Sequence, residues 1–358
     1  ASSVPPSASG TQPEGLSPSA FKGVQQFPKA AFTLADAPGR PLEFDWTWHA
    51  SIIPFDHDAS CMPMLLLRTD LRNPSEERLK CSIMLNMAPP PTASDEPFHT
   101  ILPALVEYED NVRLKPDDGS EFEEYDHGPV RNGIIFGDPP DGPGPAMAAC
   151  LAVRAWNARF STAVWNPLNA LEESRLWEDF AETGRLPRVA PSRAPSHGAV
   201  CCDFWLNPGE KRHVMFVYAW YHRTPPAAAP AYAALWGGAG DVARHGLRHA
   251  DYLLSAVGNW HKRLLDQASV PAWLGQRLVR STAAFSRSAA LAPNGAFEWR
   301  SGADGAASCD RFDLCLPVML FFPRYEAAAL SAHAASRRGP ADMEATAAFA
   351  VSAYRDYL

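Results

Sequence analysis

One carboxylate in the sequence stands in a setting suited to sugar chemistry. Glu298 lies in the segment NGAFEWRSG, where Phe297 and Trp299 flank it. An aromatic face can stack on a pyranose ring while a neighbouring carboxylate attacks or stabilises the anomeric carbon. The segment reads as a polar-flanked turn between two apolar helices. The residues alone therefore favour a solvated surface glutamate, and leave catalysis by Glu298 as the alternative.

Two histidine-bearing segments have weaker patterns. His245 and His249 are four residues apart, a spacing that can place two imidazoles on one helix face for zinc. No HExxH glutamate accompanies them and Gly246 weakens the helix, so solvated surface histidines are favoured. The run Asp56-His57-Asp58 could suggest a carboxylate–histidine pair. It lies in a Pro-flanked loop, which is typical of capping and turn formation.

The seven cysteines offer neither a metal nor a redox pattern. Cys201 and Cys202 are adjacent, and vicinal cysteines are more often small buried hydrophobic residues than a redox pair. Cys309 and Cys315 flank Asp310 without usable metal spacing. The absence of any CxxC pair favours a reducing compartment. We therefore expect no metal site in this chain.

The composition is that of a chain with a substantial core. Of 358 residues, 46% are hydrophobic and 20% are charged, which excludes a disordered, collagen-like or coiled-coil protein. The formal net charge is -8, whereas nucleic-acid binders usually carry a basic face, so no nucleic-acid partner is expected. The length suggests two domains.

No targeting or membrane signal is visible in the sequence. No stretch approaches the roughly 18 consecutive apolar residues of a membrane-spanning helix. No basic region followed by an apolar region marks a secretory signal peptide. We expect an intracellular protein, either soluble or in peripheral contact with a membrane.

The elements expected to position these residues fall into two parts, and the first is strand-like. A Ser-, Pro- and Ala-rich tail is expected over residues 1–26. Asn73-Pro74-Ser75 separates two apolar runs and indicates a hairpin. Many strands without intervening helices predict an antiparallel β-sandwich over residues 27–224. The predicted strands cover residues 31–34, 42–49, 64–71, 81–87, 133–136, 148–155 and 213–220.

The second part is helical. Residues 225–249 read as a linker rich in Ala, Pro and Gly. Beyond it, residues 250–265 and 271–291 carry apolar side chains at helical spacing. The chain is therefore expected to be a multi-domain protein, an antiparallel β-sandwich followed by a helical domain over residues 250–358.

Several segments in order resemble glycoside hydrolase family 116, the family of the non-lysosomal glucosylceramidase and related β-glucosidases. The stretch FTLADAPGRPLEFDWTWHASIIPFDHDASCMPMLLLRTDLRNPSEERLKCSIMLN resembles the family's sandwich. LWEDFAETGRLP and GAVCCDFWLNPGEKRHVMFVYAWY are similar to the end of that domain, and LLDQASVPAWLGQRLVRS to the entry into its toroid. NGAFEWRSGADGAASCDRFDLCLPVMLFFPRYE resembles the segment that carries the family's nucleophile. The resemblance covers most of residues 27–323.

The resemblance implies a sandwich followed by an (α/α)6 toroid, and retaining hydrolysis of a β-glucoside or a glucosylceramide-like lipid. Glu298 falls where the family's nucleophile lies. Asp310 falls near an aspartate that is expected to bind sugar hydroxyls. Trp299 and loops of the sandwich are candidate walls for the leaving group. The resemblance implies no metal and no organic cofactor.

Two departures from the family pattern keep a second function open. SGADGAAS replaces an aromatic-rich bridge, and no segment matches the surroundings of the family's general acid/base aspartate. The roughly 100 residues after Trp260 cannot hold twelve helices averaging about 11–12 residues, so a partial toroid is expected, in a shortened or incompletely represented relative. The alternative is a catalytically inactive relative that serves as a structural or interaction subunit, with protein partners covering its exposed helix faces.

Overall fold

Most of the described residues belong to two antiparallel sheets and to the helices packed around them. The computed structural model describes residues 21–34, 42–88, 104–108, 130–136, 147–166, 168–187, 197–222, 231–266, 271–291, 297–299 and 321–322. The predicted β-sandwich followed by helices is confirmed. Most of the residues that were expected to form a partial toroid lie outside the described ranges.

The larger sheet has eight strands in the order β1-β2-β3-β4-β11-β8-β7-β6, and the smaller sheet has three in the order β5-β10-β9. The strands of the larger sheet are β1 (Phe21–Gln26), β2 (Lys29–Leu34), β3 (Glu43–Ala50), β4 (Met64–Arg72), β11 (Lys211–His222), β8 (Met147–Ala155), β7 (Val130–Phe136) and β6 (Ala104–Tyr108). Those of the smaller sheet are β5 (Leu79–Met87), β10 (His197–Leu206) and β9 (Arg159–Trp165). All seven predicted strand runs fall wholly or almost wholly within these strands.

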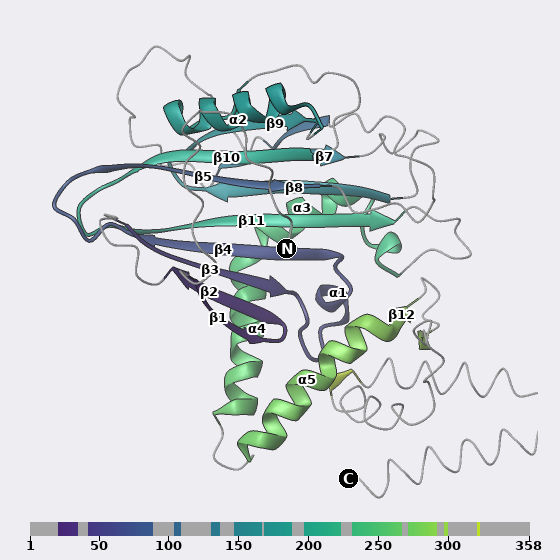
Figure 1. Ribbon diagram of the computed structural model, residues 1–358. Helices are drawn as coiled ribbons and strands as arrows, with labels where there is room; N and C mark the ends of the chain where they lie inside the picture. Colours follow the sequence, from purple (N-terminus) through teal and green to yellow (C-terminus); the bar gives the residue numbers. More distant parts are fainter. Residues whose placement is uncertain are drawn as a thin grey trace, which may run out of the picture.

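Helices cover the outer faces of both sheets. The helices are α1 (His57–Ser60), α2 (Ala170–Thr183), η3 (Ala231–Ala234), α3 (Ala239–Arg248), α4 (Ala250–Leu265) and α5 (Ala272–Ser288). Helix α2 packs on the smaller sheet, and α3 and α4 pack on the larger one. The order of layers is therefore α2, smaller sheet, larger sheet, and then α3 with α4 (Figure 1).

Strand β11 shows why the larger sheet is covered on both faces. Successive side chains of a strand point to opposite faces. Phe216 packs between the two sheets, whereas Met215 and Val217 pack against the helices. All three side chains are fully buried. The near-continuous apolar run of this strand follows from burial on both faces.

The predicted hairpin at Asn73 is wrong, because β4 and β5 belong to different sheets. The turn between them is an arch from one sheet to the other, and the β10–β11 turn is a second arch beside it. The backbone N–H of Asn73 donates to the Glu210 carbonyl at 3.0 Å, and that of Gly209 donates to the Asn73 carbonyl at 2.8 Å. Each strand of one arch pairs with a strand of the other arch, β4 with β11 and β5 with β10. This pairing builds two sheets whose apolar faces can pack on each other.

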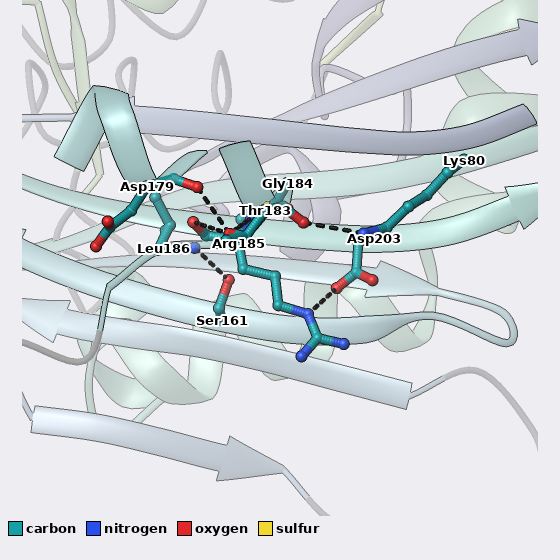
Figure 2. A network of polar contacts seen from close by, with 9 residues as sticks. Lys80, Ser161, Asp179, Thr183, Gly184, Arg185, Leu186 and Asp203 are labelled. Atoms are coloured by element: carbon teal, nitrogen blue, oxygen red, sulfur yellow. Dashed lines mark hydrogen bonds and ion pairs between the residues drawn. The ribbon is translucent and has the colours of Figure 1, made fainter. Parts of the chain in front are cut away.

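Helix α2 was not expected from the sequence, and a polar network attaches its C-terminal end to the smaller sheet. The Arg185 side chain reaches toward Asp203 of β10, with 3.2 Å between Nε and Oδ1 (Figure 2). The backbone N–H of Leu186 donates to Ser161 Oγ at 2.9 Å, and Lys80 Nζ donates to the Thr183 carbonyl at 3.0 Å. These contacts join the last residue of α2 and the chain directly after it to all three strands of the smaller sheet.

Two segments have more structure than the sequence suggested. Strand β1 begins at Phe21, inside the range 1–26 that was expected to be a tail. Helix α3 lies inside the range 225–249 that was expected to be a linker. Its Val242 and Leu247 are fully buried against the larger sheet. Tertiary burial stabilises this helix although Gly240 and Gly246 weaken its intrinsic propensity.

Candidate functional site

The residue expected to act as nucleophile lies in a hairpin that directly follows α5. The hairpin consists of β12 (Ala289–Leu291) and β13 (Phe297–Trp299). Glu298 stands opposite Ala290, and Trp299 stands opposite Ala289. Glu298 therefore lies in a short strand instead of the expected turn between two helices, as suits its aromatic neighbours. Asp310 lies outside the described residues.

A loop of the sandwich, residues 51–62, is held by an internal set of hydrogen bonds. Ser60 Oγ accepts from the backbone N–H of Ile53 and donates to the carbonyl of the same residue, both at 2.9 Å. Ser51 Oγ donates to the Ala59 carbonyl at 2.7 Å. Asp56 Oδ1 accepts from the Ala59 backbone N–H at 3.0 Å and so caps α1. The capping interpretation of Asp56-His57-Asp58 is confirmed by this bond.

The same loop contacts a segment that follows the Glu298 hairpin in the chain. The backbone N–H of Phe55 donates to the Phe321 carbonyl at 2.9 Å. The His57 ring lies 6.3 Å from the ring of Phe322, which is fully buried. The 51–62 loop therefore joins the sandwich to the C-terminal part of the chain.

Helix α4 also contacts this loop. Tyr252 Oη donates to Asp56 Oδ2 at 3.1 Å, and Trp260 Nε1 donates to the Ile52 carbonyl at 3.0 Å. The Trp260 ring also lies 5.9 Å from the ring of Phe321. The hydrogen bond to the Asp56 carboxylate raises the pKa of Tyr252, because that negative charge disfavours the phenolate. Loop, helix and the 321–322 segment thus form one junction.

Two imidazoles, those of His261 in α4 and His49 in β3, lie near the turn between β1 and β2. His261 is 4% exposed, and its Nε2 lies 2.7 Å from the Phe27 carbonyl, so this nitrogen is the donor in the neutral ring. Burial lowers the pKa of His261. Burial, followed by the charges of Lys29 and Arg68, lowers the pKa of His49 to about 4. Both rings are therefore neutral at neutral pH.

Within the described ranges, His245 and His249 have no third residue placed to complete a zinc site. The two rings lie 4.4 Å apart between centroids. Burial lowers the pKa of His245. Among the described residues, no group of three His, Cys, Asp or Glu side chains is arranged to hold a metal ion.

The vicinal cysteines are buried in two different cores. Cys201 packs with α2 on the outer face of the smaller sheet, and Cys202 packs between the sheets. Burial raises the pKa of Cys201 to about 12 and that of Cys202 well above its ordinary value, so both thiols are protonated. The interpretation as small hydrophobic residues is confirmed. Cys309 and Cys315 lie outside the described residues.

The junction around Phe55 and Tyr252 could not be predicted from the sequence. Their separation in the chain hid the contact, since no local periodicity links a sandwich loop to a helix almost 200 residues later. The one available signal was an aromatic residue, Phe55, set between Pro54 and Asp56 in a loop sequence. None of the helices in the described ranges is long and apolar enough to cross a membrane.

Comparison with known proteins adds two findings. The sequence profile described as "beta-glucosidase 2, glycosyl-hydrolase family 116 N-term" matches residues 17–252. The matched range contains the sandwich, the 51–62 loop and Tyr252, and it ends before the Glu298 hairpin.

A solved structure described as "Putative kojibiose phosphorylase from human microbiome" is similar at 6% sequence identity and a TM-score of 0.32. The similarity covers 73% of this chain and 27% of that chain. The family profile, which matches well over half of the sequence, places this chain in glycosyl-hydrolase family 116 through the family's N-terminal region.

Proposed function

We propose that this chain takes part in the retaining hydrolysis of a β-glucoside, with Glu298 as the nucleophile. Membership of family 116 carries the proposal, since the matching profile is described as a β-glucosidase. The assignment of Glu298 rests on the resemblance of its segment to the one that carries the family's nucleophile. A glucosylceramide-like lipid is a candidate substrate within this class.

The chemistry would follow the two-step course of retaining glycosidases. The Glu298 carboxylate attacks the anomeric carbon, while a partner carboxylic acid protonates the leaving oxygen and then activates water. The two carboxyl groups of such enzymes lie about 5–5.5 Å apart. The partner acid is not assigned to a residue of this chain. Asp310 would bind sugar hydroxyls, Trp299 would line the site, and the mechanism calls for no metal or organic cofactor.

The arrangement of domains supports this assignment of roles. We propose a sandwich domain over residues 27–224, extended at its edge by β1, a connection over 225–249 that contains helix α3, and a helical domain over 250–358 that carries the reacting carboxylate. The bonds from Phe55 to Phe321 and from Tyr252 to Asp56 support a sandwich that braces the helical domain. Such bracing would fix the reacting groups against each other, as catalysis by positioning requires.

Covalent labelling tests the nucleophile directly. A cyclitol epoxide of β-glucose configuration should form an ester with Glu298, seen as a mass increase on the peptide that contains it. Glu298→Gln should abolish both the adduct and aryl β-glucoside hydrolysis. Glu173→Gln, in the first turn of α2 on the far side of the smaller sheet, is the matched control and should keep both. Hydrolysis by Glu298→Gln at the wild-type rate would exclude the assignment.

A second candidate function is that of an inactive relative acting as an interaction subunit. The replacement of the family's aromatic-rich bridge by SGADGAAS favours it. In that case the epoxide leaves the full-length chain unlabelled, and the chain purifies in a larger complex. A labelled Glu298 excludes this alternative.

A further inference from the structure

Phe55 adopts a backbone conformation that its side chain disfavours. Its φ is 66°, in the left-handed region, where a bulky residue is a true outlier. Glycine or asparagine is the usual choice for such a position. The side chain is nevertheless an aromatic ring that is 67% exposed. Neither the backbone conformation nor burial in the core explains why phenylalanine occupies this position.

The surrounding loop holds Phe55 in this conformation. The Asp56 backbone N–H donates to the Ile53 carbonyl at 3.2 Å, closing a tight turn around Phe55. On one side of that turn, Ser60 Oγ binds both backbone groups of Ile53. On the other, the Asp56 carboxylate binds the Ala59 N–H and Tyr252 Oη. Strain that persists because its surroundings impose it is typical of functional sites.

The position of the ring in the fold suggests what it serves. The backbone of Phe55 bonds to Phe321, and its neighbour Asp56 bonds to Tyr252 at the start of α4. Phe55 therefore stands where the sandwich meets the C-terminal part of the chain, which contains Glu298, and its ring is exposed there. Phenylalanine has no polar atom with which to bind sugar hydroxyls, so it suits an apolar group.

We propose that Phe55 is a specificity-determining residue that contacts the apolar leaving group of the β-glucoside. This inference rests on the proposed function, because it needs a glucoside bound beside Glu298. The sandwich would then supply the leaving-group side of the site, while the helical domain supplies the reacting carboxylate. The fixed loop keeps the ring in place before the substrate arrives, which limits the entropy lost on binding.

The test compares octyl and methyl β-glucoside, whose alkoxide leaving groups have similar reactivity but different apolar area. Phe55→Gly removes the ring and also relieves the positive φ, so the fold should be kept and the Tm should not fall. The ratio of kcat/KM for octyl over methyl glucoside should drop about tenfold, as expected for the loss of one apolar contact. Phe55→Tyr keeps an aromatic ring and should therefore keep most of the wild-type ratio. Leu168→Ala, at an exposed position before α2, is the matched control and should leave the ratio at the wild-type value.

The outcomes separate this inference from the proposed function. If the wild-type chain hydrolyses both glucosides and Phe55→Gly keeps the wild-type ratio, only the inference about Phe55 is overturned. If the wild-type chain hydrolyses neither glucoside and Glu298 stays unlabelled, the proposed function fails and the inference falls with it. A lower ratio in Phe55→Gly at an undiminished Tm supports a contact with the leaving group.

Discussion

The side-chain amide of Asn73 donates to the Leu206 carbonyl at 3.1 Å, across 133 positions of sequence, and so joins the two arches of the sandwich. Asn73 is fully buried, and every hydrogen-bonding position of its amide is used. Nδ2 also donates to the Glu77 carbonyl at 2.7 Å, while Oδ1 accepts from the N–H and the hydroxyl of Ser75. Asn73→Ala should therefore lower the free energy of unfolding by about 2–3 kcal/mol, measured by urea denaturation.

Asn73→Asp separates geometry from charge at the same site. A carboxylate cannot donate to the carbonyls of Leu206 and Glu77, and it repels them, so this variant should lose more stability than Asn73→Ala at neutral pH. Protonation restores one donor, so its deficit relative to wild type should shrink as the pH falls. Asn207→Ala, at the exposed position of the neighbouring arch, is the control and should cost under about 1 kcal/mol. Equal losses in both alanine variants would contradict the role of Asn73.

The ion pair between Arg185 and Asp203 gives a second prediction. The Asp203 side chain is 6% exposed and that of Arg185 is 32% exposed. The buried carboxylate therefore loses more than the guanidinium does when the ion pair is broken. Arg185→Met should destabilise the protein by roughly 1–3 kcal/mol, because it removes a partner from a buried charge. Adding Asp203→Asn should recover part of that loss in urea denaturation. Additive losses in the double variant would show that the two side chains do not interact.

The sequence predicted the sandwich well because its strands are apolar on both faces or clearly alternating. The β11 segment from Val214 to Ala219 is a short apolar run rich in branched and aromatic residues, which favours the buried strand that is observed. The pairing of strands was less accessible. Asn73-Pro74-Ser75 has the composition of a hairpin turn, yet the strands on either side pair with β11 and β10. Local turn chemistry fixes a reversal of the chain, whereas burial decides which strands pair.

The candidate site was predicted in part only. The motif around Glu298 could be recognised because its chemistry is local to one segment, and its role remains a prediction. The roles of Phe55 and Tyr252 could not be predicted, because neither a positive φ nor a contact between residues 196 positions apart produces a periodic pattern in the sequence. Helix α3 was not predicted either. Its two glycines lower the helix propensity of the segment, and burial against the larger sheet stabilises the helix.

Two glycines of positive φ allow backbone strain to be separated from steric conflict. Gly184, which ends α2, has φ 74°, and Gly209 in the β10–β11 arch has φ 71°. A Cβ at Gly184 would collide with the Ser82 side chain, whereas one at Gly209 meets nothing within 4 Å. Gly209→Ala should cost about 1 kcal/mol of stability from the left-handed conformation alone. Gly184→Ala should cost clearly more, and Ser82→Ala in the same chain should return it toward the Gly209→Ala value, as measured by urea denaturation.

His49 should make the protein less stable in acid. Its pKa is lowered to about 4 in the folded state, by burial first and then by Lys29, Arg68 and His261, with Asp70 opposing them. The unfolded chain, in which a histidine has a pKa of about 6.5, binds the proton more readily. The stability is therefore complete above pH 6.5 and falls as the pH drops toward 4, by roughly 2 kcal/mol at about pH 5 from this residue.

His49→Gln keeps a neutral polar side chain at all pH values and should remove that part of the pH dependence. The measurement is urea denaturation of both proteins at about pH 7.5 and pH 5, where the wild type should lose more stability than the variant. His261, whose pKa burial also lowers, should account for part of the remaining slope. His49→Gln combined with His261→Gln should therefore be flatter than either single variant. Parallel slopes for wild type and His49→Gln would mean that the His49 ring takes up protons equally well folded and unfolded.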